Sequence, residues 1–219
     1  MIPRAGRRIG SVASAIAVAA GAAACAALSL SGAIAVVLAL SGRAVAAPVD
    51  YKFDPTHSFV TFELLHFNTS TLRGRFGPLN GSVTLDREAR RGRVQVVIDT
   101  QAVSTGLGVL DARLREPDML SVDAHPQAFF VAERFEFNAE GEPTAVRGEF
   151  TLRGQSQPLT LTAQRFRCYT SPLFRREVCG GDFEAEFKRS SFGITHSLPF
   201  VGDAVRLRVQ VEAIAQQGQ

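Results

Sequence analysis

His57 to Phe67 read HSFVTFELLHF, and this stretch alternates between two chemically different faces. Alternation that is rich in aromatic and β-branched residues predicts a β-strand rather than a helix. Glu63 lies on one face, and because a carboxylate is rarely buried without a partner, that face is expected to meet solvent. The other face is therefore expected to point inward, and it carries Ser58, Val60, Phe62, Leu64 and His66.

Segments with the same two-residue alternation recur along the chain. The further expected strands are 51–54, 75–86, 94–103, 127–137, 145–152, 158–166, 182–188 and 204–214. One stretch, 107–120, instead places Leu107, Leu110 and Leu114 at helical spacing until Pro117 interrupts it, which predicts one or two short helices.

This pattern of elements predicts an all-β fold. About eight strands with one polar and one apolar face suit an antiparallel meander, and closing the meander into a barrel removes its exposed edges. We therefore expect an eight-stranded antiparallel β-barrel with a short helical insert. Such a barrel has room for packed side chains or for one small ligand, so the sequence does not decide between a filled core and a hollow cavity.

Residues 1–47 are expected to be a signal peptide rather than part of the fold. Arg4, Arg7 and Arg8 precede an apolar stretch that runs from Ile9 to about Leu40, and a small-x-small cleavage pattern ends at Ala46. Cleavage near Ala46/Ala47 would leave 48–219 as one domain, in the periplasm or secreted. An uncleaved membrane anchor is the rival interpretation because the apolar stretch is long, and the pair of arginines leaves twin-arginine export open.

The charge balance argues against nucleic-acid binding. The whole chain has 24 basic and 21 acidic residues, but the leader holds four arginines and no acidic residue. The remainder has 20 basic and 21 acidic residues, a net charge near −1, so no basic surplus remains to attract a polyanion.

Two cysteines, Cys168 and Cys179, follow the leader. In an exported protein such an isolated pair predicts a disulfide, and closing this short loop is worth at most about 3 kcal/mol. A metal site is not expected, because the stretch between the cysteines offers only Glu177 as a further ligand and the four histidines are scattered.

Several motifs, taken in order, resemble the YceI-like family. HSFVTFELLHF followed by LRGRFGPLNGSVTLD resembles the opening of that family, and LDARLREPDML followed by SVDAHPQAFF resembles its helical insert and the turn after it. GEFTLRGQSQPLTL resembles its central hairpin, and SSFGI with VGDAVRLRVQVEAI resembles its ending. The resemblance covers about Tyr51 to Ile214. Two features depart from the family pattern: Arg113 stands where the insert often carries a histidine, and the cysteine-bounded stretch looks like a local elaboration at a barrel mouth.

The resemblance implies an exported, lipocalin-like barrel that binds a long isoprenoid, quinone tail or similar amphiphilic lipid in its interior. No other cofactor and no metal is expected. Separately from the resemblance, transient contact with a membrane and a homodimer are further partner expectations. The expected lipid-binding residues are those of the inward faces, with His66 near a ligand headgroup: Val60, Phe62, Leu64, His66, Phe150, Leu152, Phe183 and Phe187.

Two other classes of function remain as alternatives. One is an enzyme that modifies a lipid or quinone in the same cavity, although no nucleophile elbow, phosphate loop or acid–base set is recognisable and no catalytic residue is assigned. The other is a solid-core interaction module without a ligand, in which the same apolar residues simply pack together.

Overall fold

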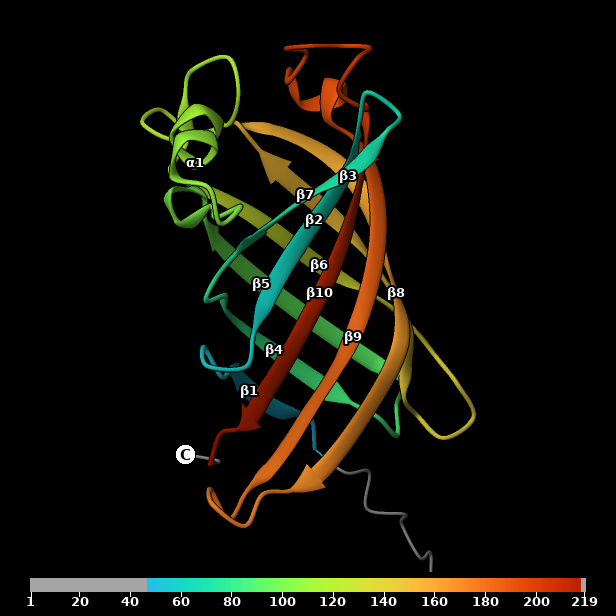
Figure 1. The fold of residues 1–219 in the computed structure, drawn as a ribbon. Coiled ribbons are helices and arrows are strands. Elements are labelled where there is room, and N and C mark those ends of the chain that lie inside the picture. The colour runs from blue at the N-terminus through green and yellow to red at the C-terminus, as the bar shows by residue number, and fades with distance from the viewer. Residues whose placement is uncertain (1–46, 218–219) are drawn as a thin grey trace, which may run out of the picture. The chain divides into compact units, whose positions relative to one another are not determined.

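The computed structural model describes residues 47–217, which form a β-barrel with a helical insert at one end (Figure 1). The predicted leader, 1–47, lies outside the described residues except for its last position. The strands are β1 (Val49–Phe53), β2 (Phe59–His66), β3 (Ser70–Phe76), β4 (Asn80–Asp86), β5 (Arg91–Asp99), β6 (Gln127–Phe137), β7 (Pro143–Leu152), β8 (Gln155–Thr170), β9 (Glu177–Lys188) and β10 (Ala204–Ala215). The helices are α1 (Gly108–Arg115) and two 3-10 turns, Thr100–Ala102 and Arg189–Phe192. No helix in the described part of the chain has the length and apolarity needed to cross a membrane.

The ten strands occupy eight positions in one closed antiparallel barrel, as predicted. Neighbouring strands follow the order β1-β4-β5-β6-β7-β8-β9-β10-β2-β3, and β1 also pairs with β10. One edge of β10 pairs with β9, while its other edge pairs with β2 through Arg206–Gln210 and with β1 through Ala213–Ala215. β1 and β2 therefore share one position in the barrel, and β3 and β4 share the next.

The two faces of β2 point inward and outward as the sequence predicts. Val60 and Phe62 are buried, whereas Glu63 lies on the outer face. Its carboxylate accepts from Arg73 at 3.3 Å and lies 3.4 Å from Arg208, so the acidic group is paired on the outside of the barrel. β7 behaves in the same way, because Val146, Phe150 and Leu152 are all buried.

The two ends of the barrel differ in what covers them. We call the end that carries α1, the β2–β3 turn and segment 193–203 the upper end, and the end that carries the β8–β9 turn the lower end (Figure 1). Residues 116–125, which follow α1, fold back onto the end of that helix through backbone hydrogen bonds. Examples are the bonds from Leu120 N to Leu114 O and from Val122 N to Arg115 O. The single α-helix agrees with the short helical insert that the sequence predicts.

Several strand boundaries differ from the predicted ones. The segment expected over 75–86 is divided between β3 and β4, and the strand expected over 94–103 ends at Asp99, where a 3-10 turn follows. Segment 69–74 lies between two strands predicted from the sequence and was not itself predicted as one, but β3 begins at Ser70 and pairs with β2 from His66 back to Val60. The chain can continue as a strand through Gly74 because the Phe62 ring fills the space beside it: a Cβ built at Gly74 would lie 2.3 Å from that ring. Gly74 thus interrupts the alternation of apolar residues in the sequence, but its missing side chain makes room for the Phe62 ring.

The cysteines lie inside two strands rather than in a loop, and the short turn 171–176 lies between them. β8 and β9 run on to Thr170 and from Glu177, and Cys168 lies directly opposite Cys179 in their register. The predicted disulfide is present, with a Cα–Cα distance of 4.0 Å. It therefore joins the two strands of a hairpin at the lower end of the barrel.

Candidate functional site

The interior of the barrel holds two apolar cavities, one above the other. The upper cavity is enclosed by inward residues of the upper halves of the strands together with residues of the insert and of segment 193–203. Its lining comprises Val60, Phe62, Leu64, Phe76, Ile98, Thr100, Leu114, Met119, Leu120, Ala128, Phe150, Leu152, Phe187, Arg189, Ile194, Val205 and Leu207.

The lower cavity is enclosed by the lower halves of the same barrel positions. Its lining comprises Tyr51, Phe53, Leu79, Val83, Leu85, Val94, Val96, Phe130, Phe135, Pro143, Val146, Leu161, Phe166, Cys179, Gly180, Phe183, Val209, Val211 and Ala213. No residue lines both cavities.

Both cavities are small. Their volumes are about 100 Å³ for the upper and about 80 Å³ for the lower one. Pre-formed sites for small molecules typically measure roughly 300–1,000 Å³, so side chains already fill most of this interior. A bulky ligand would have to displace some of them, and the large side chains that line the upper cavity are the rings of Phe62, Phe76, Phe150 and Phe187.

Most of the residues predicted from the sequence come together around the upper cavity. Six of the eight line it: Val60, Phe62, Leu64, Phe150, Leu152 and Phe187. Phe183 lines the lower cavity instead. The rings of Phe150 and Phe187 lie 5.5 Å apart, although 36 positions separate them in the chain, so the predicted set includes real neighbours from different strands.

His66 does not reach the interior, contrary to the prediction for the inward face. It is exposed at the end of β2, its ring lies 4.8 Å from that of Phe67, and its backbone bridges to Val201. The alternation breaks here because β2 turns into β3 directly after His66, so this side chain is placed at the rim rather than along the wall.

The lower cavity and the residues from the insert were missed by sequence reasoning. Val94, Val96 and Val146 show the same alternation as the predicted set, so that signal was available. Leu114 and Met119, by contrast, line the upper cavity from outside the strands, and nothing in their local sequence pattern identifies them as lining residues.

Only two lining residues of the upper cavity carry polar side chains, and both are satisfied by the protein. Thr100 donates its hydroxyl to the carbonyl of His125 at 2.8 Å. Arg189, which is 4% exposed, donates to three backbone carbonyls of segment 193–203: those of Ile194 at 3.0 Å, Val201 at 2.8 Å and Gly202 at 2.8 Å. Burial lowers the pKa of this guanidinium, yet an arginine remains charged at any ordinary pH. Its function here is to fix the segment above the cavity.

A second polar cluster connects the insert to the same segment. Arg113 donates to Asp118 through two nitrogens at 2.6 Å and to Glu116 at 2.5 Å. His196 lies 3.1 Å from the same Asp118 carboxylate. The hydrogen bonds from Arg113 lower the pKa of Asp118 to about 2. Arg113, at the position where a family histidine was expected, is thus engaged in an ion-pair network on the surface of the upper end.

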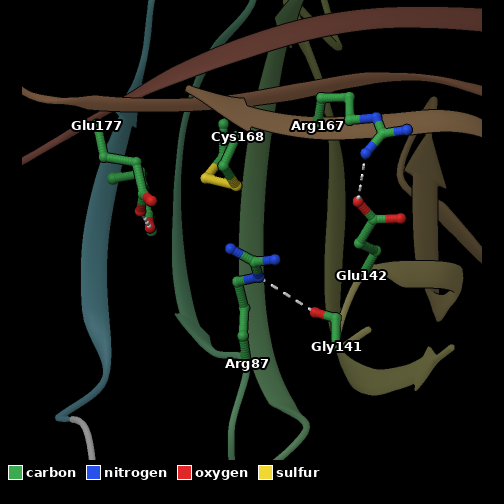
Figure 2. The surroundings of a disulfide bond; sticks show 8 residues. Arg87, Gly141, Glu142, Arg167, Cys168 and Glu177 are labelled. Carbon is green, nitrogen blue, oxygen red and sulfur yellow. Dashed lines mark hydrogen bonds and ion pairs between the residues drawn. A yellow bond between two sulfur atoms is a disulfide. The ribbon is translucent and has the colours of Figure 1, made fainter. Parts of the chain in front are cut away.

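Two residues that line the lower cavity, Tyr51 and Cys179, lie close to Glu177, which Figure 2 shows beside the disulfide. Tyr51 is 2% exposed and donates its hydroxyl to Glu177 in a short hydrogen bond. Burial, followed by this bond to a carboxylate, raises the pKa of Tyr51. The Arg87 side chain extends from the β4–β5 turn in the direction of the disulfide and donates to the carbonyl of Gly141 at 3.3 Å. Charged side chains therefore surround the lower end of the interior.

Among the described residues, one group has the side chains and the spacing to hold a metal ion, namely Cys168, Glu177 and Cys179. The two sulfur atoms of this group are bonded to each other, and a disulfide does not supply the thiolate ligands that such a site needs.

Comparison with known proteins identifies the family of this barrel. A family model described as the YceI-like domain matches residues 51–213. A UPF0312 protein of Pseudomonas paraeruginosa is 34% identical over 187 residues, which cover 84% of this chain and 95% of that protein.

Two solved structures have the same fold. BcnA of Burkholderia cenocepacia matches with a TM-score of 0.60 at 18% identity, covering 73% of this chain and 98% of BcnA. A polyisoprenoid binding domain from Saccharophagus degradans, implicated in plant cell wall breakdown, matches with a TM-score of 0.55 at 19% identity, covering 76% of this chain and 98% of that domain.

Proposed function

The chain belongs to the YceI-like family, and we propose that it is an exported binding protein that holds a long-chain isoprenoid, quinone or related amphiphilic lipid inside the barrel, as a carrier or reservoir. The observation that carries this proposal is the chemistry of the interior. Both cavities are lined almost entirely by aliphatic and aromatic side chains, and the polar groups among them are already hydrogen-bonded to the protein. Apolar cavities of this kind stay dry and accept apolar guests.

The ligand class has support from two directions. Each Å² of apolar ligand surface removed from water is worth roughly 25 cal/mol, so a long apolar chain gains most from an interior that is apolar along its length. The Saccharophagus degradans domain, which has the same fold, is a polyisoprenoid binding domain. The disulfide supports the exported location, because such bonds persist in oxidising compartments.

We propose no catalytic activity. Of the described residues that line the cavities, only Tyr51 and Arg189 carry ionisable side chains. Tyr51 is hydrogen-bonded to Glu177, and Arg189 is fixed by three backbone carbonyls. General acid–base chemistry needs a group that is free to exchange a proton with the substrate, and neither residue is in that condition.

A filled barrel without a small ligand is the second candidate, and the small cavity volumes favour it. Native mass spectrometry of the protein purified from a bacterial periplasm separates the two. A discrete extra mass that disappears on solvent extraction and is recovered as a lipid is expected. A protein that stays unliganded when isoprenoid alcohols, quinones and fatty acids are offered would establish the filled barrel.

Two neighbouring leucines provide a matched pair of variants for this experiment. Leu64 lines the upper cavity, whereas Leu65 lies on the opposite face of β2 and is 49% exposed. Leu64→Arg places a charge beside the cavity near the upper end, from which the long side chain can reach solvent, so the barrel is expected to fold. Leu64→Arg should abolish the extra mass, and Leu65→Arg should retain it. Equal retention by both variants would place the lipid outside the barrel.

We propose that the transient contact with a membrane is made by the upper end. The exposed rings of Phe67 and Phe200 stack there with centroids 5.4 Å apart, at the end of the barrel that contains the upper cavity. Serine at both positions should reduce co-sedimentation with lipid vesicles, whereas Leu173→Ser, in the exposed β8–β9 turn at the lower end, should not. Equal loss in the two variants would refute this orientation. A homodimer remains a prediction.

A further inference from the structure

A layer of inward side chains separates the two cavities. Within this layer, residues that are opposite each other on neighbouring strands line different cavities. On one side of the barrel, Val96 pairs with Phe130, which pairs with Phe150. Val96 and Phe130 line the lower cavity, whereas Phe150 lines the upper one. The boundary between the cavities therefore runs through this row of hydrogen-bonded strands.

The same boundary appears among strands β2, β9 and β10. Val60 pairs with Val209, which pairs with Phe183. Val60 lines the upper cavity, and the other two line the lower one. These two rows make a constriction across the interior, which we call the waist: Val60, Val96, Phe130, Phe150, Phe183 and Val209.

Two phenylalanine rings of the waist rest against glycine backbone. A Cβ built at Gly148 would lie 2.9 Å from the tip of the Phe130 ring, and one built at Gly181 would lie 3.3 Å from the Phe183 ring. Each ring therefore packs directly on glycine backbone and fills the space that a side chain there would occupy. Opening the waist breaks this contact and requires a change of side-chain rotamer, which is the cost of displacing the ring.

We propose that the waist sets the length of ligand that the barrel prefers. This inference rests on the proposed lipid-binding function. A short isoprenoid enlarges the upper cavity alone, by displacing side chains of its own lining, and leaves the waist closed. A long isoprenoid extends into the lower cavity, and its binding carries the additional cost of displacing the rings of Phe130 and Phe183. These two residues are thus determinants of specificity for chain length.

Two phenylalanines on β9 make the test a matched one. Phe183 lies in the waist, and Phe187, four residues further along the same inward face, lines only the upper cavity. Phe183→Leu and Phe187→Leu are the same chemical change, but only the first removes a ring from the constriction. Phe130→Leu, on β6, opens the waist from another strand and is expected to act in the same direction as Phe183→Leu.

The experiment is a competition between farnesol, a short isoprenoid alcohol, and solanesol, a long one, followed by native mass spectrometry of the full mature protein. In Phe183→Leu the ratio of solanesol to farnesol retained should rise about tenfold, which corresponds to about 1.4 kcal/mol of ring displacement no longer required. In Phe187→Leu both alcohols contact the altered wall, so the ratio should change by less than about twofold.

Two different failures are distinguishable in this competition. Equal ratios in Phe183→Leu, Phe130→Leu and Phe187→Leu, with both alcohols still retained, would overturn the role of the waist and leave the lipid-binding proposal intact. Retention of neither alcohol by the wild-type protein would overturn the lipid-binding proposal itself, and with it the inference about chain length.

Discussion

Replacing Arg189 with methionine tests whether one buried cation fixes the segment above the upper cavity. The methionine keeps an unbranched apolar stem but cannot donate to the carbonyls of Ile194, Val201 and Gly202. The three hydrogen bonds do not count equally. The bond to Ile194 is buried, and leaving a buried acceptor without a partner costs roughly 1–3 kcal/mol. The other two are partly buried, so water can replace part of their energy.

Together these contributions predict that Arg189→Met lowers the free energy of unfolding by about 3 kcal/mol. Urea denaturation with linear extrapolation measures it, and the slope of the transition should be unchanged because the same surface is exposed on unfolding. Hydrogen exchange should locate the effect, with faster exchange of the amides of segment 193–203, for example Val201, which donates to Ser197 at 2.9 Å.

Arg153 provides the matched control for this change. Its guanidinium also donates to backbone carbonyls, those of Pro117, Phe192 and Gly193, but two of these bonds are exposed and one is only partly buried. Arg153→Met should therefore cost less, about 1 kcal/mol. Equal losses in the two variants, or a loss below about 0.5 kcal/mol in Arg189→Met, would refute the argument that burial of the carbonyls determines the cost.

Three further predictions concern the disulfide and two titrating groups. Reducing the disulfide should lower the free energy of unfolding by at most about 3 kcal/mol, seen as a lower urea midpoint; an unchanged midpoint would mean that the hairpin holds without it. Asp118 has a pKa of about 2 against an ordinary 3.8, so its contribution to stability is present above pH 3.8 and is lost as the pH falls toward 2. Its carboxyl carbon should titrate there by NMR, and Arg113→Gln should raise the midpoint. The hydrogen bond to Asp54 raises the pKa of His57 above 6.5, so its contribution is present below pH 6.5 and is lost as the pH rises through the raised value. Asp54→Asn should bring the NMR midpoint of His57 down, and an unmoved midpoint would exclude this pairing.

The wall of the barrel could be predicted from the sequence because its signal is local. In β2, the period of two separates buried Val60 and Phe62 from outward Glu63, and the pleat of a strand turns that spacing directly into two faces. The same reasoning predicts the buried face of β7. The disulfide was predictable for a different reason, because Cys168 and Cys179 are an isolated pair in a chain expected to be exported.

The division of the interior could not be predicted in this way, because it depends on register between strands. Phe183 and Phe187 are the same residue type and lie on the same inward face of β9, yet they line different cavities. Only the pairing of β9 with β10 and β6 with β7 places the boundary between them. Arg189 was missed for a similar reason, since the carbonyls that it binds belong to an irregular segment with no sequence pattern.

The position of β10 also has a consequence for how the chain acquires its fold. This strand is the last in sequence order, yet it completes the barrel by pairing with β1 and β2, which come first. Until Ala204–Ala215 are available, the edges of β1 and β2 have no partner there and closure is impossible. Contacts so distant in sequence form slowly, and an unclosed chain with free strand edges is prone to aggregate while it waits. We therefore expect the newly made chain to depend on chaperones that cover strand edges until its final strand is available.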